Sequence, residues 1–287
     1  MIVRRLDRVV TTPAPAPGFM GAGHLAALVV DPNDFEGHDP FIVLADDLVD
    51  LAPGATAGGE HPHAGFETVT LVVEGTLHDE DEGVTSEGDV VWMTAGRGII
   101  HNEHVVPQGR TRILQLWLTL PPHERWAEPR FEVVRRDAAP VRREPGVEVR
   151  VYSGTSGDAR STTHNFVPVT MLDVRLDAGA TLAQELPASY NGFIYLLAGS
   201  VVVDGDVVET GQVGWLDRPS GKGPTSLRVT AGSNGARFLL YAGEPQNVPL
   251  VTHGPFVGET RADLMRASRD YLDGKFVRMS ALVRAAS

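Results

Sequence analysis

Short runs of β-branched, leucine and aromatic residues recur along the chain, each bounded by glycine, proline or aspartate. This alternation predicts β-strands through most of the sequence. The runs cover residues 41–44, 67–73, 89–93 and 111–120 in the first half, and 167–176, 193–197, 200–203, 207–209, 227–230 and 236–241 in the second. Asp204-Gly205 between two of them is a hairpin signal, because these residue types readily take positive φ in a tight turn.

One segment near the C-terminus has helical spacing. Leucine, alanine and methionine form an apolar side over residues 261–272, with Thr260 as a possible N-cap and Gly274 as a stop. The sequence therefore predicts one short C-terminal helix in a chain that is otherwise β.

The length points to more than one domain. The chain has 287 residues, and its 31 glycines and 20 prolines are spread as expected for many short strands joined by turns. Residues 137–147 carry two prolines and mixed charge, which predicts a linker. We expect an all-β fold of two antiparallel β-barrels, an N-terminal one in residues 1–136 and a C-terminal one, with the helix, in residues 146–287.

The two halves show a weak internal correspondence. Superposing residues 74–76 on 198–200 sets Glu185 and Pro187 opposite His61 and His63. If the halves are repeats, the second lacks these histidines, and we expect the C-terminal barrel to be metal-free.

Composition limits the classes of function. The formal charge of −12 argues against direct nucleic-acid binding, which needs a basic face to neutralise phosphates. The N-terminus reads as a first strand rather than a signal peptide, and no apolar run approaches the roughly 18–20 residues of a membrane helix. We expect a cytoplasmic protein that does not associate with membranes. With no cysteine in the chain, thiolate metal sites and disulfides are excluded.

Two short clusters carry the chemistry that the sequence reveals, His61-Pro62-His63 and His101-Asn102-Glu103. Each places two metal-ligand side chains at positions i and i+2, which share one face of a β-strand. Three imidazoles and one carboxylate suit a divalent transition ion, and an octahedral ion would keep two positions open for water or substrate. His61, His63, His101 and Glu103 are therefore the predicted metal ligands.

Several motifs resemble the pirin family, two-barrel members of the cupin superfamily. They are HPHAGFETVT from position 61, GDVVWMTAGRGIIHNE from 88, LQLWLTL from 114, AGEP from 242, HGPFV from 253 and DYLDGKF from 270. This resemblance covers nearly the whole chain and implies a bicupin fold with the same four metal ligands. It makes iron the expected metal, with manganese, nickel, copper or zinc as alternatives.

The resemblance also implies two alternative functions. Some pirins open flavonols such as quercetin with dioxygen; here the substrate would be a small, flat polyphenol, O2 the co-substrate, and Glu103 both metal ligand and general base. Others are co-regulators in which the oxidation state of iron sets binding to a protein partner. We favour the quercetinase-type dioxygenase, because the predicted site has open coordination positions and an available carboxylate.

Two nearby residues leave the ligand set open. The family usually has an apolar residue and then proline after the glutamate, whereas this chain has His104-Val105. Strand alternation points His104 away from the metal, but a bulge would let it compete with Glu103 and favour nickel, copper or zinc. Glu67 shares the parity of His61 and His63, and we interpret it as supporting an imidazole N–H rather than binding metal.

Overall fold

The computed structural model describes residues 2–52, 55, 57–79, 83–102 and 109–286. The chain forms two compact units. Residues 13–37, 41–136 and 246–287 make up one, called here the N-terminal barrel, and residues 1–12, 38–40 and 137–245 make up the other, the C-terminal barrel. No helix among the described residues has the length and apolar character needed to cross a membrane.

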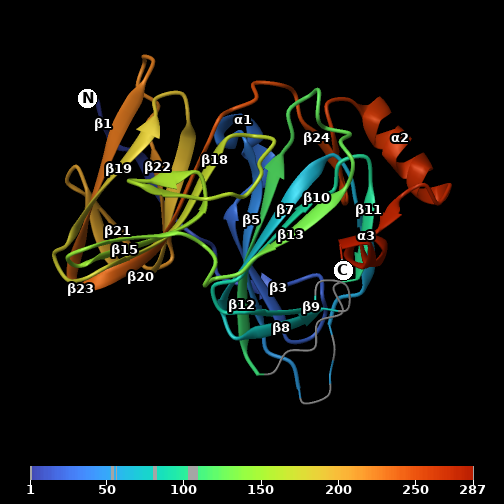
Figure 1. The fold of residues 1–287 in the computed structure, drawn as a ribbon, viewed down its shortest axis with the longest axis horizontal. Coiled ribbons are helices and arrows are strands. Elements are labelled where there is room, and N and C mark those ends of the chain that lie inside the picture. The colour runs from blue at the N-terminus through green and yellow to red at the C-terminus, as the bar shows by residue number, and fades with distance from the viewer. Residues whose placement is uncertain (1, 53–54, 56, 80–82, 103–108, 287) are drawn as a thin grey trace. The chain divides into compact units, whose positions relative to one another are not determined.

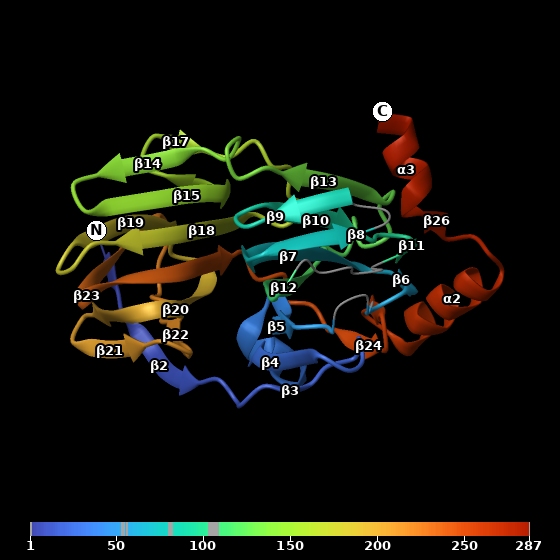
Figure 2. The same ribbon diagram turned by 90° about the horizontal axis from the view of Figure 1, so that it is seen from below.

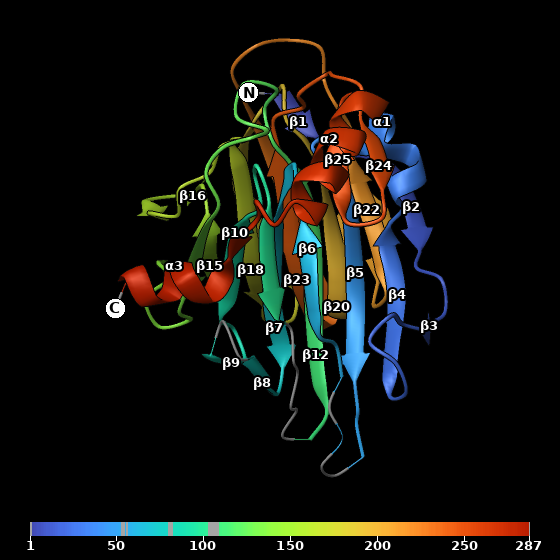
Figure 3. The ribbon, with the colours of Figure 1, turned by 90° about the vertical axis from the view of Figure 1, so that its right-hand side faces the viewer.

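The N-terminal barrel is built on a seven-stranded sheet in which each strand pairs antiparallel with its neighbours (Figures 1 and 3). In spatial order its strands are β13 (Arg130–Val134), β10 (Val90–Thr94), β7 (Phe66–Glu74), β12 (Thr111–Thr119), β5 (Phe41–Val49), β4 (His24–Val30) and β3 (Ala16–Pro17). A three-stranded sheet contains β26 (Val277–Arg278), β11 (Ile99–Asn102) and β6 (Glu60–His63). Two hairpins complete it, β8 (Thr76–Asp79) with β9 (Gly83–Ser86) and β24 (Val251–His253) with β25 (Phe256–Gly258).

The C-terminal barrel is built on a ten-stranded sheet, in which β14, β15 and β18 are successive neighbours and lie side by side in Figure 2. Its main path is β14 (Val141–Glu144), β15 (Val147–Ser153), β18 (Val169–Leu176), β23 (Pro224–Gly243), β20 (Asn191–Val203), β22 (Gln212–Leu216) and β2 (Leu6–Thr11). Off this path are β1 (Ile2–Arg4), β19 (Thr181–Pro187) and β21 (Asp206–Glu209), and β16 (Thr155–Ser156) pairs with β17 (Ala159–Arg160). The all-β, two-barrel prediction is confirmed.

The helices are short. They are a 3₁₀ turn (Pro32–Asp34), α1 (Phe35–His38), α2 (Arg261–Leu272) and α3 (Met279–Ala286). The predicted helix is α2: Thr260 Oγ1 accepts the Asp263 N–H, and the Asp263 carboxylate accepts the Thr260 N–H, a reciprocal capping box. The sequence did not indicate α3, whose first residue, Met279, is buried against Met93 and Ile99.

The domain boundaries differ from the sequence prediction at three places. Residues 1–12 belong to the C-terminal barrel, where β1 pairs with β23 and β2 with β22. Residues 246–287 belong to the N-terminal barrel, where β26 pairs with β11. The predicted linker 137–147 contains β14, which pairs with β15 inside the C-terminal barrel. Proline and charge show where a chain turns, but strand pairing decides which core each end joins.

Apolar side chains fill the interior of the C-terminal barrel. Along β19, Leu182, Gln184 and Leu186 are buried, whereas Glu185 and Pro187 are exposed. The two positions that the repeat alignment set opposite the histidines therefore face outward. Leu182 and Leu186 pack in a cluster with residues of β15, β18, β20 and β23.

Arg4 is the buried cation that joins β1 to this barrel. It is 1% exposed, and its guanidinium donates to Thr225 Oγ1 and to the carbonyls of Pro187, Ala188, Tyr190 and Asp217. The N-terminal strand is thus held by polar contacts as well as by its pairing with β23.

We expect Arg4→Ala to lower the free energy of unfolding by about 3–5 kcal/mol, because it leaves several buried carbonyls without their donor. Urea denaturation of the purified variant measures the change. Arg5→Ala is the matched control: the Arg5 side chain is 69% exposed in its ion pair with Asp204, and its removal should cost less than about 1 kcal/mol. Equal losses for the two variants would contradict the role assigned to Arg4.

Candidate metal centre

Strand pairing brings three histidines together. β6 and β11 run antiparallel, with His61 directly opposite His101 and His63 opposite Ile99. His61 and His63 lie on the same side of β6, as their i, i+2 spacing predicts, with ring centroids 4.8 Å apart. The His101 ring centroid is 4.3 Å from that of His61 and 5.1 Å from that of His63.

The ring nitrogens of these histidines form a group suited to an ion. One potential ligand atom from each of His61, His63 and His101 lies within 4.8 Å of the others, the one such group of three or more in the part of the chain that the structure describes. The Nε2 atoms of His61 and His101 are 3.0 Å apart. Two nitrogens bound at about 2.1 Å to one ion, at right angles, would be separated by about this distance.

Electrostatics keeps the cluster available for metal binding. Burial lowers the pKa of His63 well below its usual value, and the neighbouring His101 and His61 lower it further. His61 Nδ1 donates to the Gly59 carbonyl at 2.8 Å, since a carbonyl can only accept. That bond leaves the lone pair on Nε2, the atom that faces His101. Neutral imidazole with a free lone pair is the form that binds a metal.

A cavity of about 570 Å³ opens beside the imidazoles. Its lining residues include His61, His63, Phe19, Gln115, Trp117 and Pro255. The Trp117 ring is 5.6 Å from that of His63 and 4.3 Å from that of Phe66, so aromatic faces adjoin the histidines. A pocket with mostly apolar walls and a few convergent polar atoms is typical of a small-molecule site.

Sequence reasoning missed several of these wall residues. Gln115 and Trp117 alternate along β12, so an i, i+2 reading of the LQLWLTL string could have found them. Phe19 lies outside any periodic segment and gave no signal, and Pro255 lies in the HGPFV motif, which indicated the family but not this cavity. Trp92 and Met93 are buried core residues: Met93 packs with Ala95, Ile99 and Met279, and Trp92 is paired across the sheet with Val69.

Glu67 does not support an imidazole. Its carboxylate accepts a 2.6 Å hydrogen bond from Thr94 Oγ1 and lies 3.8 Å from Arg130 Nη2. Phe66 is in ring contact with His63, so the next residue of β7 points to the opposite face of the sheet. The parity argument fails because β6 ends at His63 and the chain turns at Gly65, where φ is 89°.

Gly65 is required at that turn. A Cβ there would lie 1.9 Å from the Val257 carbonyl oxygen, and the positive φ disfavours other residues as well. The Gly65 N–H donates to the Gly96 carbonyl, and the Ala64 N–H donates to the Pro255 carbonyl. The turn that ends β6 is therefore fixed by two other segments of the same barrel.

Other candidates have ordinary structural roles or are not described. Arg97 pairs with Glu128 in an exposed bidentate ion pair. His253 lies in the β24–β25 hairpin, which belongs to the N-terminal barrel. Glu103 and His104, predicted as a ligand and its possible competitor, lie outside the described residues.

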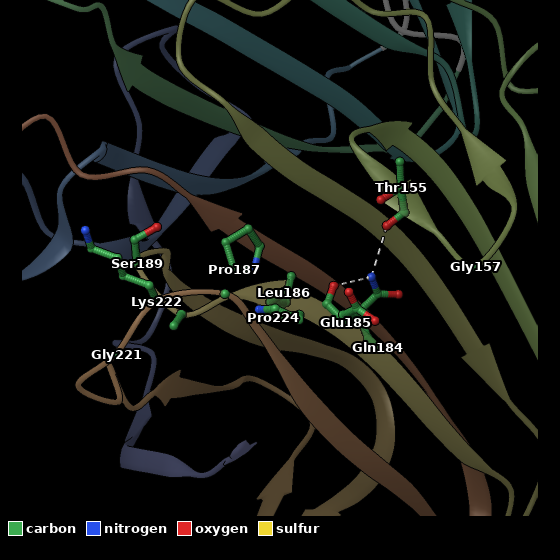
Figure 4. Close-up of a pocket in the computed structure, with 12 residues that line it drawn as sticks. Thr155, Gly157, Gln184, Glu185, Leu186, Pro187, Ser189, Gly221, Lys222 and Pro224 are labelled. Carbon is green, nitrogen blue, oxygen red and sulfur yellow. Dashed lines mark hydrogen bonds between the residues drawn. The ribbon is translucent and has the colours of Figure 1, made fainter. Parts of the chain in front are cut away.

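A hollow of about 570 Å³ in the C-terminal barrel has no comparable cluster among its lining residues (Figure 4). Its buried amide, Gln184, donates to the carbonyls of Thr155 and Glu185 and accepts from Ser156 Oγ. These polar groups satisfy one another's hydrogen bonds. Among the described residues, the side chains that converge as potential metal ligands are therefore the histidines of the N-terminal barrel.

Comparison with known proteins finds a family match in each half of the chain. Residues 29–118 match the family described as pirin, and residues 171–277 match the pirin C-terminal cupin domain. Human pirin is 32% identical over 262 residues, covering 89% of each chain. A pirin-like protein of Caulobacter vibrioides is 36% identical over 265 residues, covering 89% of this chain and 94% of that relative.

Solved structures give the same result. A protein from Geobacillus kaustophilus is 38% identical with a TM-score of 0.78, covering 87% of this chain and all (100%) of that one. A quercetin 2,3-dioxygenase from Acinetobacter baumannii is 28% identical with a TM-score of 0.83, covering 96% of this chain and 98% of that one. A bacterial pirin from Escherichia coli in complex with nickel(II) has a TM-score of 0.63 and 22% identity, covering 83% of this chain and 99% of that one, and shares the fold.

Glu67 generates a pH-dependent prediction. Burial raises its pKa from about 4.5 to about 7, against the opposing effect of Thr94. The folded state therefore binds a proton more tightly than the unfolded state, and this group's contribution to stability falls as the pH rises from about 4.5 to 7. The loss amounts to about 3 kcal/mol once the pH exceeds 7.

We expect Glu67→Gln, which keeps the shape of the side chain but cannot ionise, to remove that loss. The difference in unfolding free energy between the variant and the wild type should grow through this pH window and be constant above it. Urea denaturation at a series of pH values, at equal metal content, measures the difference. Glu74→Gln, at the exposed end of the same strand, should show the same dependence of unfolding free energy on pH as the wild type. If Glu67→Gln also showed the wild-type dependence on pH, the raised pKa assigned to Glu67 would be refuted.

Proposed function

This chain belongs to the pirin family, and on that premise we propose that it is a metal-dependent dioxygenase of the quercetinase type. Its substrates would be flavonols or similar small, flat aromatic compounds, and its co-substrate O2. The observation that carries the proposal is the convergence of His61, His63 and His101 beside an aromatic-walled cavity. The quercetin 2,3-dioxygenase from Acinetobacter baumannii, which has the same fold over nearly its whole length, adds support.

The three imidazoles fit a divalent transition ion, because they present nitrogen donors at close range and the lowered pKa of His63 favours its neutral form. We propose Glu103 as the fourth ligand, on the sequence argument that it shares the alternation of His101. Iron is the expected ion, with manganese, nickel, copper or zinc as alternatives; nickel(II) is the ion named for the Escherichia coli pirin.

A bound ion would supply the Lewis acidity and redox chemistry that a reaction with dioxygen needs. The chain itself would bind and orient the substrate. Trp117 provides an aromatic wall for a flat ring system beside His63. The Glu103 carboxylate would accept the proton of the substrate hydroxyl, as a general base placed next to the ion.

The first test is oxygen uptake with quercetin by protein reconstituted separately with iron, manganese, nickel, copper or zinc. We expect uptake and loss of flavonol absorbance with at least one ion. His101→Ala should abolish both and lower metal binding below one ion per chain, because it removes a donor from a buried site. His253→Ala is the control, since this exposed histidine lies in β24, outside the cluster.

Stoichiometric metal binding without oxygen uptake for any ion would reject the dioxygenase. It would favour the alternative function, a metal- or redox-dependent regulator acting through a protein partner. Affinity capture in each oxidation state would then be the experiment to make.

Glu103→Gln separates the two roles of this carboxylate. We expect the variant to retain metal through the three imidazoles, while kcat falls by about 10²–10⁴-fold because the general base is lost. Metal analysis and steady-state oxygen uptake on the same preparation measure the two effects. Undiminished kcat with bound metal would show that another group takes the proton.

A further inference from the structure

An exposed phenylalanine stands at the edge of the histidine cavity. Phe19 is 69% exposed, yet it lines the same cavity as His61, His63 and Trp117. Its ring is 6.2 Å from that of His61 in an edge arrangement. Because most of this large apolar side chain is exposed, it gains little from burial, and core packing does not explain its position.

The loop that carries Phe19 is closed at its base. It spans residues 18–23, between β3 and β4. The Gly18 N–H donates to the His24 carbonyl at 2.9 Å, and the His24 N–H donates to the Gly21 carbonyl at 3.1 Å. Gly21 and Gly23 both have positive φ, 101° and 87°, the region that glycine enters without strain. The loop is therefore a defined turn that presents Phe19 at its tip.

A buried polar pair supports this turn from below. His24 is 1% exposed, and its Nε2 lies 2.8 Å from Asp47 Oδ1. Its Nδ1 accepts the N–H of Met20 at 3.2 Å, so the proton on Nε2 is the one directed at the carboxylate. His24 thus ties the residue after Phe19 to β5, and the Phe19 ring packs edge-on against the imidazole at 5.6 Å.

Gly18 shows how closely the turn is fitted. A Cβ at this position would lie 2.1 Å from two atoms of the His24 ring. The backbone lies against the imidazole, and any larger residue would displace the turn. The loop that carries Phe19 therefore has little conformational freedom. This lowers the entropic cost of ordering Phe19 when a ligand binds.

The charge around the cavity is also informative. Its acidic lining residue, Glu60, is paired with Arg278. The other lining side chains named above are aromatic, amide, proline and imidazole. An uncharged ligand with a flat face suits such walls better than an anion or a cation.

We propose that Phe19 is a specificity-determining residue of this site, contacting the ring system of a planar, uncharged aromatic ligand whose oxygen end lies at the histidines. The inference rests on the proposed function for the identity of the ligand class. It adds the residue that selects a multi-ring ligand over a small chelator, which would reach the imidazoles without reaching Phe19.

The test measures binding in the absence of turnover. Protein loaded with zinc, which is not redox-active, is titrated with quercetin by isothermal calorimetry, and separately with acetohydroxamic acid, a small chelator without rings. We expect Phe19→Ala to weaken quercetin binding by about 5–20-fold, the size of an aromatic contact with its buried area. Affinity for acetohydroxamic acid and zinc content should both stay within twofold of the wild type.

Two further variants make the result specific. Phe19→Tyr keeps the ring and should bind quercetin within about twofold of the wild type. Met265→Ala removes a side chain of similar exposure, 64%, from α2 and should leave both affinities unchanged. Equal quercetin affinity in Phe19→Ala and wild type, or equal weakening for both ligands, would overturn the proposal.

The outcomes separate this proposal from the one on which it rests. If wild-type protein binds quercetin through Phe19 but consumes no O2 with any metal, the Phe19 contact stands and the dioxygenase is rejected. If turnover occurs while Phe19→Ala binds normally, the dioxygenase stands and the Phe19 contact is rejected. If the wild type binds no quercetin, the proposed ligand class is wrong and the Phe19 inference is rejected with it.

Discussion

The candidate site depends on one constraint, the register in which β6 pairs with β11. Pairing sets His101 directly opposite His61, and the two-residue repeat of β6 adds His63 on the same side. A slip of one residue would turn the side chains of a strand to the other face. The three imidazoles would then no longer converge, although every residue needed for metal binding would still be present.

Segments distant in sequence fix this register. β26 pairs parallel with β11, and the Val277 N–H donates to the Gly98 carbonyl. A Cβ at Gly98 would lie 2.3 Å from the Phe276 ring, so this ring packs directly against the residue that precedes β11. At the other strand, the Val257 N–H donates to the Ala64 carbonyl. The C-terminal residues therefore stabilise both strands that carry histidines, which explains why they belong to the N-terminal barrel.

The sequence predicts those features that depend on a local pattern. The strand runs, the Asp204-Gly205 hairpin and the helix 261–272 all follow from spacing within a few residues, and the structure contains them. The runs 193–197 and 200–203, however, are joined in one strand, β20, and the runs 227–230 and 236–241 in another, β23. The closeness of His61 to His63 is predictable from local spacing as well.

The inferences that failed extended a local rule across a turn. Glu67 shares parity with His63 in the sequence, but the turn at Gly65 ends the strand between them. Two features were not predictable: the assignment of residues 1–12 to the C-terminal barrel and of residues 246–287 to the N-terminal barrel, and the turn that carries Phe19. Both depend on contacts, such as strand pairing and the approach of Gly18 to His24, that no hydrophobic periodicity in the sequence reveals.

The difference between the barrels shows how one fold can hold a ligand site or a closed core. On β6 the residues facing inward include His63, with a cavity beside it. On β19 the buried positions are held by Leu182, Gln184 and Leu186, and the amide of Gln184 is satisfied by its neighbours. Buried imidazoles are costly unless they are paired, and the depressed pKa of His63 is a measure of that cost. The apolar core of the C-terminal barrel shows that a barrel of this kind can be filled without such rings. We therefore infer that the histidines serve a bound ligand, and that a bound ion would offset the cost of burying them.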